Sequence, residues 1–351
     1  MKAYELNGLS RAPWEQGFDS VDAETLMNSP LPQSQFLVEG LIPQGVHIVC
    51  GSSKIGKSWL MLDLALKLAI GEPFWGMETA KCGVLYLSLE DTLKRIQDRL
   101  MKLTDEAPPE LRFAVTATTI GNGLEKDIAY FMSSYPETKL IIIDTFQRIR
   151  SPKNAGGSVY ANDYDDITAL KKISAELGVS IILVHHLRKQ KDADLFNQVS
   201  GSSGIVGAAD STFILQKGSR ESNAALLSAV GRDIEMQQLY LEFSSLRWNL
   251  VERKDSAAII REKAPQFLFK LIDFMRERDE WSGTATELLC VLGDTITPPV
   301  IVKNAIVEFY YDVLKPAGIE YESKKTNKAR LLTFRKSDAV TGGDGKYGIC
   351  N

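Results

Sequence analysis

The chain has 351 residues, of which 44% are hydrophobic and 25% are charged, and both values are ordinary for globular proteins. A chain of this length is expected to form about two domains. Its net charge of -4 excludes a uniformly basic nucleic-acid-binding protein, so any contact with DNA must come from local basic patches.

The apolar stretches and the cysteine spacing indicate where in the cell the protein is expected. No stretch approaches the roughly 18 apolar residues of a membrane span, and the N-terminus lacks the apolar core of a signal peptide. The cysteines are far apart and lack C-x-x-C spacing, which argues against a zinc site and a disulfide framework. They are Cys50, Cys82, Cys290 and Cys350. We therefore expect a cytoplasmic protein without membrane contact.

The chain begins with a polar region, residues 1–36, in which prolines recur. We expect this region to be an extension that becomes ordered only on a partner surface. From 37 to 252, apolar runs alternate with helical stretches, and several runs are continuously apolar, as in parallel strands covered on both faces. This pattern predicts an α/β domain with a doubly wound, mainly parallel sheet that binds ligands at the carboxyl ends of its strands. The strand-like runs are 46–49, 83–89, 140–143, 181–184 and 212–215, then a hairpin of 224–230 and 238–243 that ends at Trp248.

Residues 51–58 match G-x-x-x-x-G-K-S, a loop that holds the phosphates of ATP or GTP. Its two glycines let successive backbone N–H groups turn inward. Lys57 is predicted to reach the β- and γ-phosphates, and the Ser58 hydroxyl to ligate Mg²⁺. A strand-like run precedes the loop and a helix-like run, 59–70, follows it, which places the phosphates at a helix N-terminus. The residues predicted to surround the nucleotide are Gly51, Ser52, Ser53, Lys54, Ile55, Gly56, Lys57, Ser58 and Trp59.

Two later strand-like runs end in a carboxylate, which hydrolysis of a nucleotide needs. Asp144 is predicted to bind Mg²⁺ beside Ser58, the alternative being a strand-end cap. Glu90 is predicted to polarise the attacking water, the alternative being stabilisation of the first turn of a helix. Asp91 is expected to cap the helix that follows.

Two of the three histidines, His185 and His186, stand together after an apolar run. We favour His185 as the residue that senses the γ-phosphate and passes its state to the next loop; alternatively, the pair hydrogen-bonds neighbouring backbone. That loop, 187–204, is long, polar and partly basic. It is predicted to contact single-stranded DNA, the alternative being a solvated surface loop. Its candidate DNA contacts are Arg188, Lys189 and Lys191.

Arg232 lies between the two strands of the predicted hairpin. An arginine there could reach the γ-phosphate bound by a neighbouring subunit, because its charge is fixed and its donors are forked. The alternative is a surface turn in which Arg232 pairs with Asp233.

Residues 257–338 form a second predicted unit. Apolar residues recur at helical spacing from 267 to 275, Thr284 and Glu287 form a capping box, and Pro299 follows Pro298 where a third helix can open. Two strand-like runs then predict a hairpin. Three helices followed by a basic hairpin predict a winged helix.

Cations gather on this hairpin, and they are predicted to bind the phosphate backbone of DNA. The alternative is a solvated wing. The candidate contacts are Lys324, Lys325, Lys328 and Arg330. Residues 339–351 are rich in glycine and are expected to form a flexible tail.

With these residues assembled, the sequence resembles the RecA-like P-loop ATPases, and within them the AAA-type branch that includes RepA-type hexameric replicative helicases of plasmids, phages and mobile elements. The resemblance covers residues 36–250. The matching segments are 41–45 (LIPQG), 51–58, 71–76 (GEPFWG), 84–91 (VLYLSLED), 140–144, 185–186, 201–204 with 207–210, and 231–233.

The resemblance implies a ring, usually of six subunits, with ATP and Mg²⁺ between neighbours and single-stranded DNA in the central channel. It implies that Glu90 is the catalytic base, that Asp144 binds magnesium and that Arg232 acts in trans. The C-terminal unit departs from the minimal helicase of this branch, and it opens the prospect of duplex binding or of recruiting another replication protein.

Three functions remain in competition. The leading hypothesis is an ATP-dependent DNA-handling motor, a ring-forming replicative DNA helicase. The second is a replication initiator or helicase loader, in which ATP switches assembly and the winged helix binds duplex DNA. The third, a regulatory RecA-like ATPase that handles protein partners, ranks last because no feature of the sequence points to a protein substrate.

Overall fold

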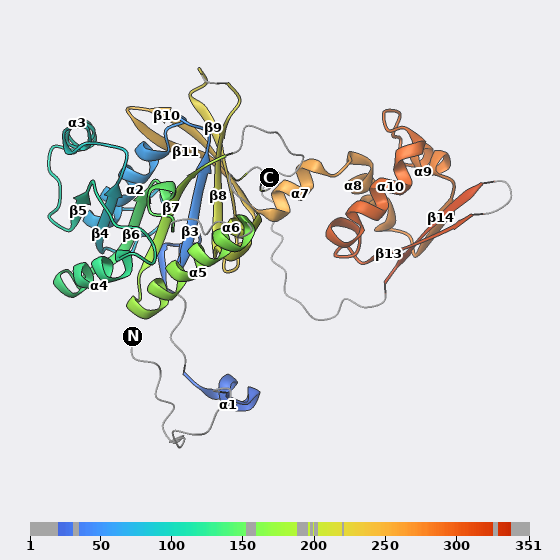
Figure 1. Cartoon of the computed structure of the whole chain (residues 1–351). Helices are drawn as coiled ribbons and strands as arrows, with labels where there is room; N and C mark the ends of the chain where they lie inside the picture. Colours follow the sequence, from blue (N-terminus) through green and yellow to red (C-terminus); the bar gives the residue numbers. More distant parts are fainter. Residues whose placement is uncertain are drawn as a thin grey trace. The chain divides into compact units, whose positions relative to one another are not determined.

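The computed structural model describes residues 20–30, 35–151, 159–187, 196, 199, 203–219, 221–325 and 329–337. The chain divides into two compact units, Met1–Arg253 and Lys254–Asn351. In Figure 1 the first unit runs from blue to yellow and the second is orange to red. No helix in the described ranges is both long and apolar enough to cross a membrane.

A nine-stranded sheet forms the centre of the first unit, in the order β11-β10-β9-β8-β3-β7-β6-β4-β5. The six strands from β8 to β5 in that order are parallel, whereas β9 runs antiparallel to β8 and to β10. The bounds are β3 (Val46–Gly51), β4 (Gly83–Ser88), β5 (Leu111–Ala114), β6 (Thr138–Asp144), β7 (Ser180–His186), β8 (Ser211–Lys217), β9 (Ala224–Gly231), β10 (Gln237–Ser244) and β11 (Arg247–Lys254).

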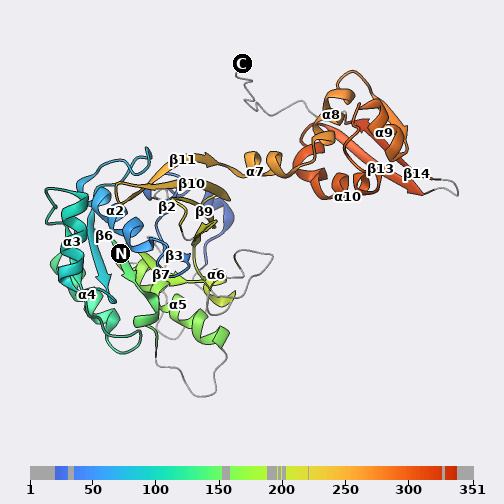
Figure 2. The ribbon, with the colours of Figure 1, turned by 90° about the horizontal axis from the view of Figure 1, so that it is seen from above.

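Helices cover both faces of this sheet. Figures 1 and 2 show α2 on one face and α5 and α6 on the other. Consecutive residues of β3 divide accordingly: Val49 packs in the core beneath α2, and Ile48 packs in the core beneath α5. A strand buried on both faces has no polar side to alternate, which explains its continuously apolar sequence. The helices are α2 (Lys57–Ile70), α3 (Leu93–Leu103), α4 (Leu124–Ser134), α5 (Val159–Leu177), α6 (Ser203–Ala208) and the short η1 (Phe146–Arg148).

The predicted α/β fold with a mainly parallel, doubly wound sheet is confirmed. The prediction that the hairpin ends at Trp248 is wrong, because a third strand, the edge strand β11, runs from Arg247 to Lys254. Strand β5 is a further element that the sequence analysis missed. So are β1 (Phe36–Val38) and β2 (Ile42–Pro43), which form a small separate sheet. Within the predicted extension lies α1 (Ala23–Asn28), none of whose residues is buried.

The second unit has its own core, with Phe267, Leu288, Ile306 and Phe334 fully buried. The predicted capping box is present, because Thr284 and Glu287 exchange hydrogen bonds at the start of α9. A small sheet in the order β12-β14-β13 completes the unit. The winged-helix assignment stays a prediction. The elements are α7 (Ser256–Lys263), α8 (Gln266–Met275), β12 (Glu280–Gly283), α9 (Ala285–Val291), α10 (Pro299–Phe309), the π-helical η3 (Tyr310–Leu314), β13 (Ile319–Lys325) and β14 (Arg330–Lys336).

Candidate nucleotide site

The phosphate loop joins β3 to α2 at the carboxyl edge of the parallel strands. Gly56 has φ of 103° and is the N-cap of α2, so no side chain caps the first-turn N–H groups of that helix. A Cβ atom at Gly56 would also lie 2.9 Å from Nε1 of Trp248. Position 56 therefore requires glycine for two reasons: the positive φ, and the lack of room for a Cβ atom beside Trp248. An uncapped helix N-terminus behind a glycine turn is suited to an anion such as a polyphosphate.

Lys57 is buried inside this loop. Its Nζ donates to the carbonyl oxygens of Gly51 at 2.8 Å and Ser52 at 3.0 Å. Burial lowers the pKa of Lys57, while the carboxylates of Asp144 and Glu90 act in the opposite direction. The ammonium therefore lies where it can exchange backbone oxygens for phosphate oxygens.

The two predicted magnesium ligands touch each other. Ser58 donates its hydroxyl to Oδ2 of Asp144 at 2.7 Å, although 86 positions separate them. Asp144 is the last residue of β6 and is 9% exposed. A hydroxyl and a carboxylate are hard oxygen donors of the kind that Mg²⁺ prefers, with water and substrate phosphates completing its shell. The residues present therefore fit a magnesium ion held by Ser58 and Asp144.

Tyr86 also reaches Asp144, although no motif in the sequence marks it. Its buried hydroxyl donates to the same Oδ2 at 3.0 Å. Burial raises the pKa of Tyr86 well above its ordinary value, and the neighbouring Asp144 adds to that effect. Tyr86 is therefore a hydrogen-bond donor to this carboxylate at every ordinary pH.

Glu90 lies two residues beyond the end of β4, with its side chain half exposed. Its Oε1 is 3.8 Å from Nε of Arg148, in η1. An exposed pair of this kind contributes little to stability, but it holds the carboxylate at the same sheet edge as Asp144. Arg148 was not predicted from the sequence, because nothing local marks an arginine four residues beyond Asp144.

The expectation that Asp91 caps the following helix is wrong. The N-cap of α3 is Thr92, whose hydroxyl accepts from the backbone N–H of Arg95 at 3.3 Å. The Asp91 carboxylate instead accepts from the side chains of Arg95 at 2.7 Å and Arg99 at 2.5 Å. The helix starts one residue later than expected, and arginines one turn apart on it share a face.

The structure places His186, rather than the favoured His185, beside the phosphate loop. Nδ1 of His186 is 3.5 Å from Nζ of Lys57, whereas His185 is 3% exposed and meets Phe146 edge-on at 5.6 Å. Successive side chains of a strand point to opposite faces, so only one of the pair can face the loop. Burial and then the Lys57 charge lower the pKa of His186.

Arg232 lies far from the phosphate loop of its own chain. It follows Gly231, which pairs with Ser211 at the start of β8, and Ser211 pairs with His47 near the start of β3. The phosphate loop begins at Gly51, four residues further along β3 and thus roughly 13 Å away at about 3.3 Å per residue. The Arg232 side chain is exposed, donates to the carbonyl oxygen of Gly207 at 3.5 Å, and forms no ion pair with Asp233, both being described residues.

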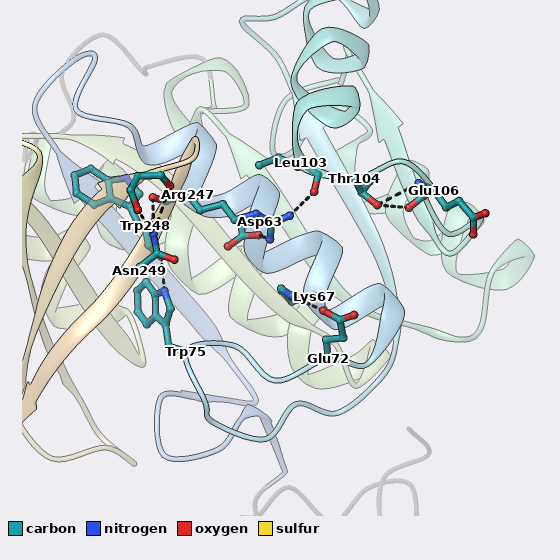
Figure 3. Close-up of polar contacts among 11 residues, drawn as sticks. Asp63, Lys67, Glu72, Trp75, Leu103, Thr104, Glu106, Arg247, Trp248 and Asn249 are labelled. Carbon is teal, nitrogen blue, oxygen red and sulfur yellow. Dashed lines mark hydrogen bonds and ion pairs between the residues drawn. The ribbon is translucent and has the colours of Figure 1, made fainter.

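The last strand of the sheet braces the phosphate loop, a role that the sequence analysis missed. Trp248 donates its indole N–H to the carbonyl oxygen of Gly56 at 3.3 Å and accepts on its own carbonyl oxygen from Trp75 at 2.6 Å. Figure 3 shows Arg247, the preceding residue, reaching from β11 to Asp63 on α2 and to the backbone of Leu103. The start of β11 thus binds α2, the end of α3 and the phosphate loop together.

The predicted DNA contacts divide into two sets. Arg188, Lys189, Lys191 and Lys328 lie outside the described residues. Lys324, Lys325 and Arg330 are exposed on the β13–β14 hairpin. Their neighbour Arg335 is neutralised by Glu280 at 3.0 Å and Glu322 at 3.5 Å, so the hairpin is less basic than its sequence suggests.

The helix that a winged helix would insert into DNA carries apolar residues on its exposed surface. Val300, Ile301 and Val307 of α10 are exposed, as is Tyr311 of the adjoining η3. Cations rather than aliphatic side chains bind the phosphate backbone. The hairpin therefore exposes Lys324, Lys325 and Arg330, whereas much of the exposed surface of α10 is apolar.

Part of the chain matches a known family and a known protein. Residues 12–192 match the model of a family described as AAA domain. The chain is 29% identical over 196 residues to the DNA repair protein RadA of Halalkalibacterium halodurans, spanning 54% of this chain and 37% of that protein.

Two solved structures align with the chain. The structure of a DnaB-like replicative helicase and its interactions with primase aligns with a TM-score of 0.52 at 16% identity, over 66% of this chain and 69% of that one. The ATPase domain of G40P aligns with a TM-score of 0.49 at 17% identity, over 60% of this chain and 85% of that one.

Proposed function

Because the chain belongs to the AAA-domain family and is a RecA-like P-loop ATPase, we propose that it is an ATP-dependent DNA-handling motor, a ring-forming and most simply hexameric replicative DNA helicase. The observation that carries the ATPase part is the contact between Ser58 and Asp144, with Glu90 and Lys57 at the same sheet edge. The helicase part is supported by the fold shared with a DnaB-like replicative helicase.

ATP would bring the phosphoanhydride, and Mg²⁺ would supply positive charge against its phosphate oxygens. Lys57 and the N-terminus of α2 would hold the phosphates, and Ser58 with Asp144 would hold the metal. Glu90 orients a water and accepts its proton, a task for which a half-exposed carboxylate at the strand end is suited. His186, in contact with Lys57, is the side chain through which the state of the phosphates is passed to the loop after β7.

The ring is supported by the position of Arg232. An exposed arginine about the length of a strand away from its own phosphate loop cannot complete its own site, but it can complete the site of a neighbouring subunit. Single-stranded DNA is the proposed substrate of the motor, and other replication proteins are proposed partners.

Strand displacement on a forked DNA tests the proposal, with wild-type protein and with Lys57→Ala. We expect ATP-dependent unwinding by the wild type and none by the variant, because the variant loses the cation that holds the β- and γ-phosphates. An ATPase that hydrolyses ATP but does not separate the strands would contradict the helicase assignment.

A second candidate function is a replication initiator or helicase loader. The exposed cations Lys324, Lys325 and Arg330 favour it, because a basic hairpin can contact the backbone of duplex DNA. ATP-dependent binding of a blunt duplex without unwinding, lost in a Lys324→Ala/Lys325→Ala variant, is the result expected of this function.

A further inference from the structure

Tyr86 stands in the middle of β4, one strand away from Asp144. Strands β4 and β6 are parallel neighbours, and Tyr86 pairs with Ile142 while Ser88 pairs with Asp144. Asp144 is thus two residues along from the partner of Tyr86, and residues two apart point to the same face of a sheet. The long phenol spans this diagonal, and its hydroxyl meets Oδ2 of Asp144 at 3.0 Å.

The tyrosine is held firmly in this position. Its side chain is 3% exposed, and its ring packs against Phe113 of β5 at 5.7 Å between centroids. A buried ring in contact with a neighbouring strand has little freedom to turn away. The direction of its hydroxyl is therefore set by the core and not by the ligand.

Two hydroxyls from different elements donate to one oxygen of Asp144. One belongs to Ser58 of α2, which is itself a candidate metal ligand. The other belongs to Tyr86, which lies in the sheet behind the carboxylate and is not a candidate ligand. Side chains that hydrogen-bond a ligating carboxylate fix its orientation, and their loss typically lowers metal affinity about 10- to 100-fold.

We propose that Tyr86 is a positioning residue, which holds the Asp144 carboxylate in the orientation that accepts Mg²⁺. The proposal rests on the proposed ATPase function and adds a residue to its metal site. Loss of the Tyr86 hydroxyl should therefore lower the affinity for Mg²⁺ and leave the binding of metal-free nucleotide unchanged.

The substitution Tyr86→Phe tests this, because it keeps the ring against Phe113 and removes only the hydroxyl. We expect the Mg²⁺ concentration that half-saturates ATP hydrolysis to rise about tenfold, with turnover restored at high Mg²⁺. Affinity for a fluorescent ATP analogue without metal should be unchanged. Direct titration of Mn²⁺ in the presence of ADP, followed by electron paramagnetic resonance, should show the same weakening without any turnover.

The matched control is Tyr240→Phe, which removes a hydroxyl that donates to Gln238 on β10 and should leave the Mg²⁺ dependence unchanged. Urea unfolding of both variants separates loss of metal affinity from loss of fold. If Tyr86→Phe is less stable but has the Mg²⁺ and Mn²⁺ affinities of the wild type, Tyr86 is only structural and the proposal is overturned. If the wild type itself binds nucleotide without any response to Mg²⁺, the ATPase assignment fails instead.

Discussion

Trp248, on the edge strand β11, donates its indole N–H to the carbonyl oxygen of Gly56 in the phosphate loop, across 192 positions of sequence. The indole is 1% exposed and fills the space that a side chain at Gly56 would need. The turn that cradles the phosphates is therefore held from outside by the far end of the sheet.

Replacing Trp248 by Phe should weaken nucleotide binding up to about tenfold, because a net hydrogen bond is worth roughly 1 kcal/mol and the loop loses its brace. Binding of a fluorescent ATP analogue measures this. Trp75→Phe is the matched control: it removes the indole hydrogen bond to the carbonyl oxygen of Trp248 and leaves the contact with Gly56 in place. Both variants should unfold at lower urea. Equal nucleotide affinities in the two would show that Trp248 only stabilises the fold.

Glu90→Gln should lower ATP turnover by about 10²- to 10⁴-fold, the usual contribution of a general base, while ATP binding persists. Single-turnover hydrolysis and equilibrium binding measure the two effects. Glu137→Gln is the control, because Glu137 is similarly exposed and also lies 3.8 Å from an arginine, Arg112. Normal turnover in Glu90→Gln would show that Glu90 is not the general base.

Arg232→Ala should abolish turnover in a ring without loss of ATP binding, because the arginine completes a neighbour's site. Lys57→Ala should be inactive for a different reason, since its own phosphate loop is defective. Mixing the two variants creates interfaces that pair an intact loop with an intact Arg232. ATP turnover should return in the mixture, and its absence over a range of mixing ratios would contradict action in trans.

The parts of this site that the sequence predicted are local or strongly periodic. Residues 51–58 define the phosphate loop by themselves, and Asp144 follows a short apolar run that is typical of a strand buried on both faces. Which of His185 and His186 faces the phosphate loop could not be predicted, because it depends on which face of β7 lies toward that loop.

Other parts depend on contacts that no local pattern encodes. The brace from Trp248 requires knowing that β11 lies at the far edge of the sheet, and β11 itself reads as a charged segment because one side of it has no neighbouring strand. The hydrogen bond from Tyr86 depends on the register between β4 and β6. The neutralisation of Arg335 depends on Glu280, 55 residues away in another strand.

His47 should make the stability of the first unit depend on pH. It is fully buried in β3, and its Nε2 is 2.7 Å from the carbonyl oxygen of Pro43. Burial lowers its pKa from the ordinary 6.5 to about 4, against smaller opposing effects of the Pro43 hydrogen bond and then of Asp210 and Asp233. The folded state thus keeps His47 neutral while the unfolded chain takes up a proton below pH 6.5.

The stabilising contribution of neutral His47 is therefore complete above pH 6.5 and is lost as the pH falls toward 4, with a slope of up to about 1.4 kcal/mol per pH unit. His47→Gln retains a side-chain amide donor but does not titrate, so its free energy of unfolding should fall less steeply over this interval. Urea unfolding at pH 7.5, 6.0 and 5.0 gives the difference between the two proteins, in which the acid titration of the carboxylates cancels. Parallel profiles would show that His47 has the same pKa in the folded and the unfolded chain, as it would if water reached the ring in the folded state.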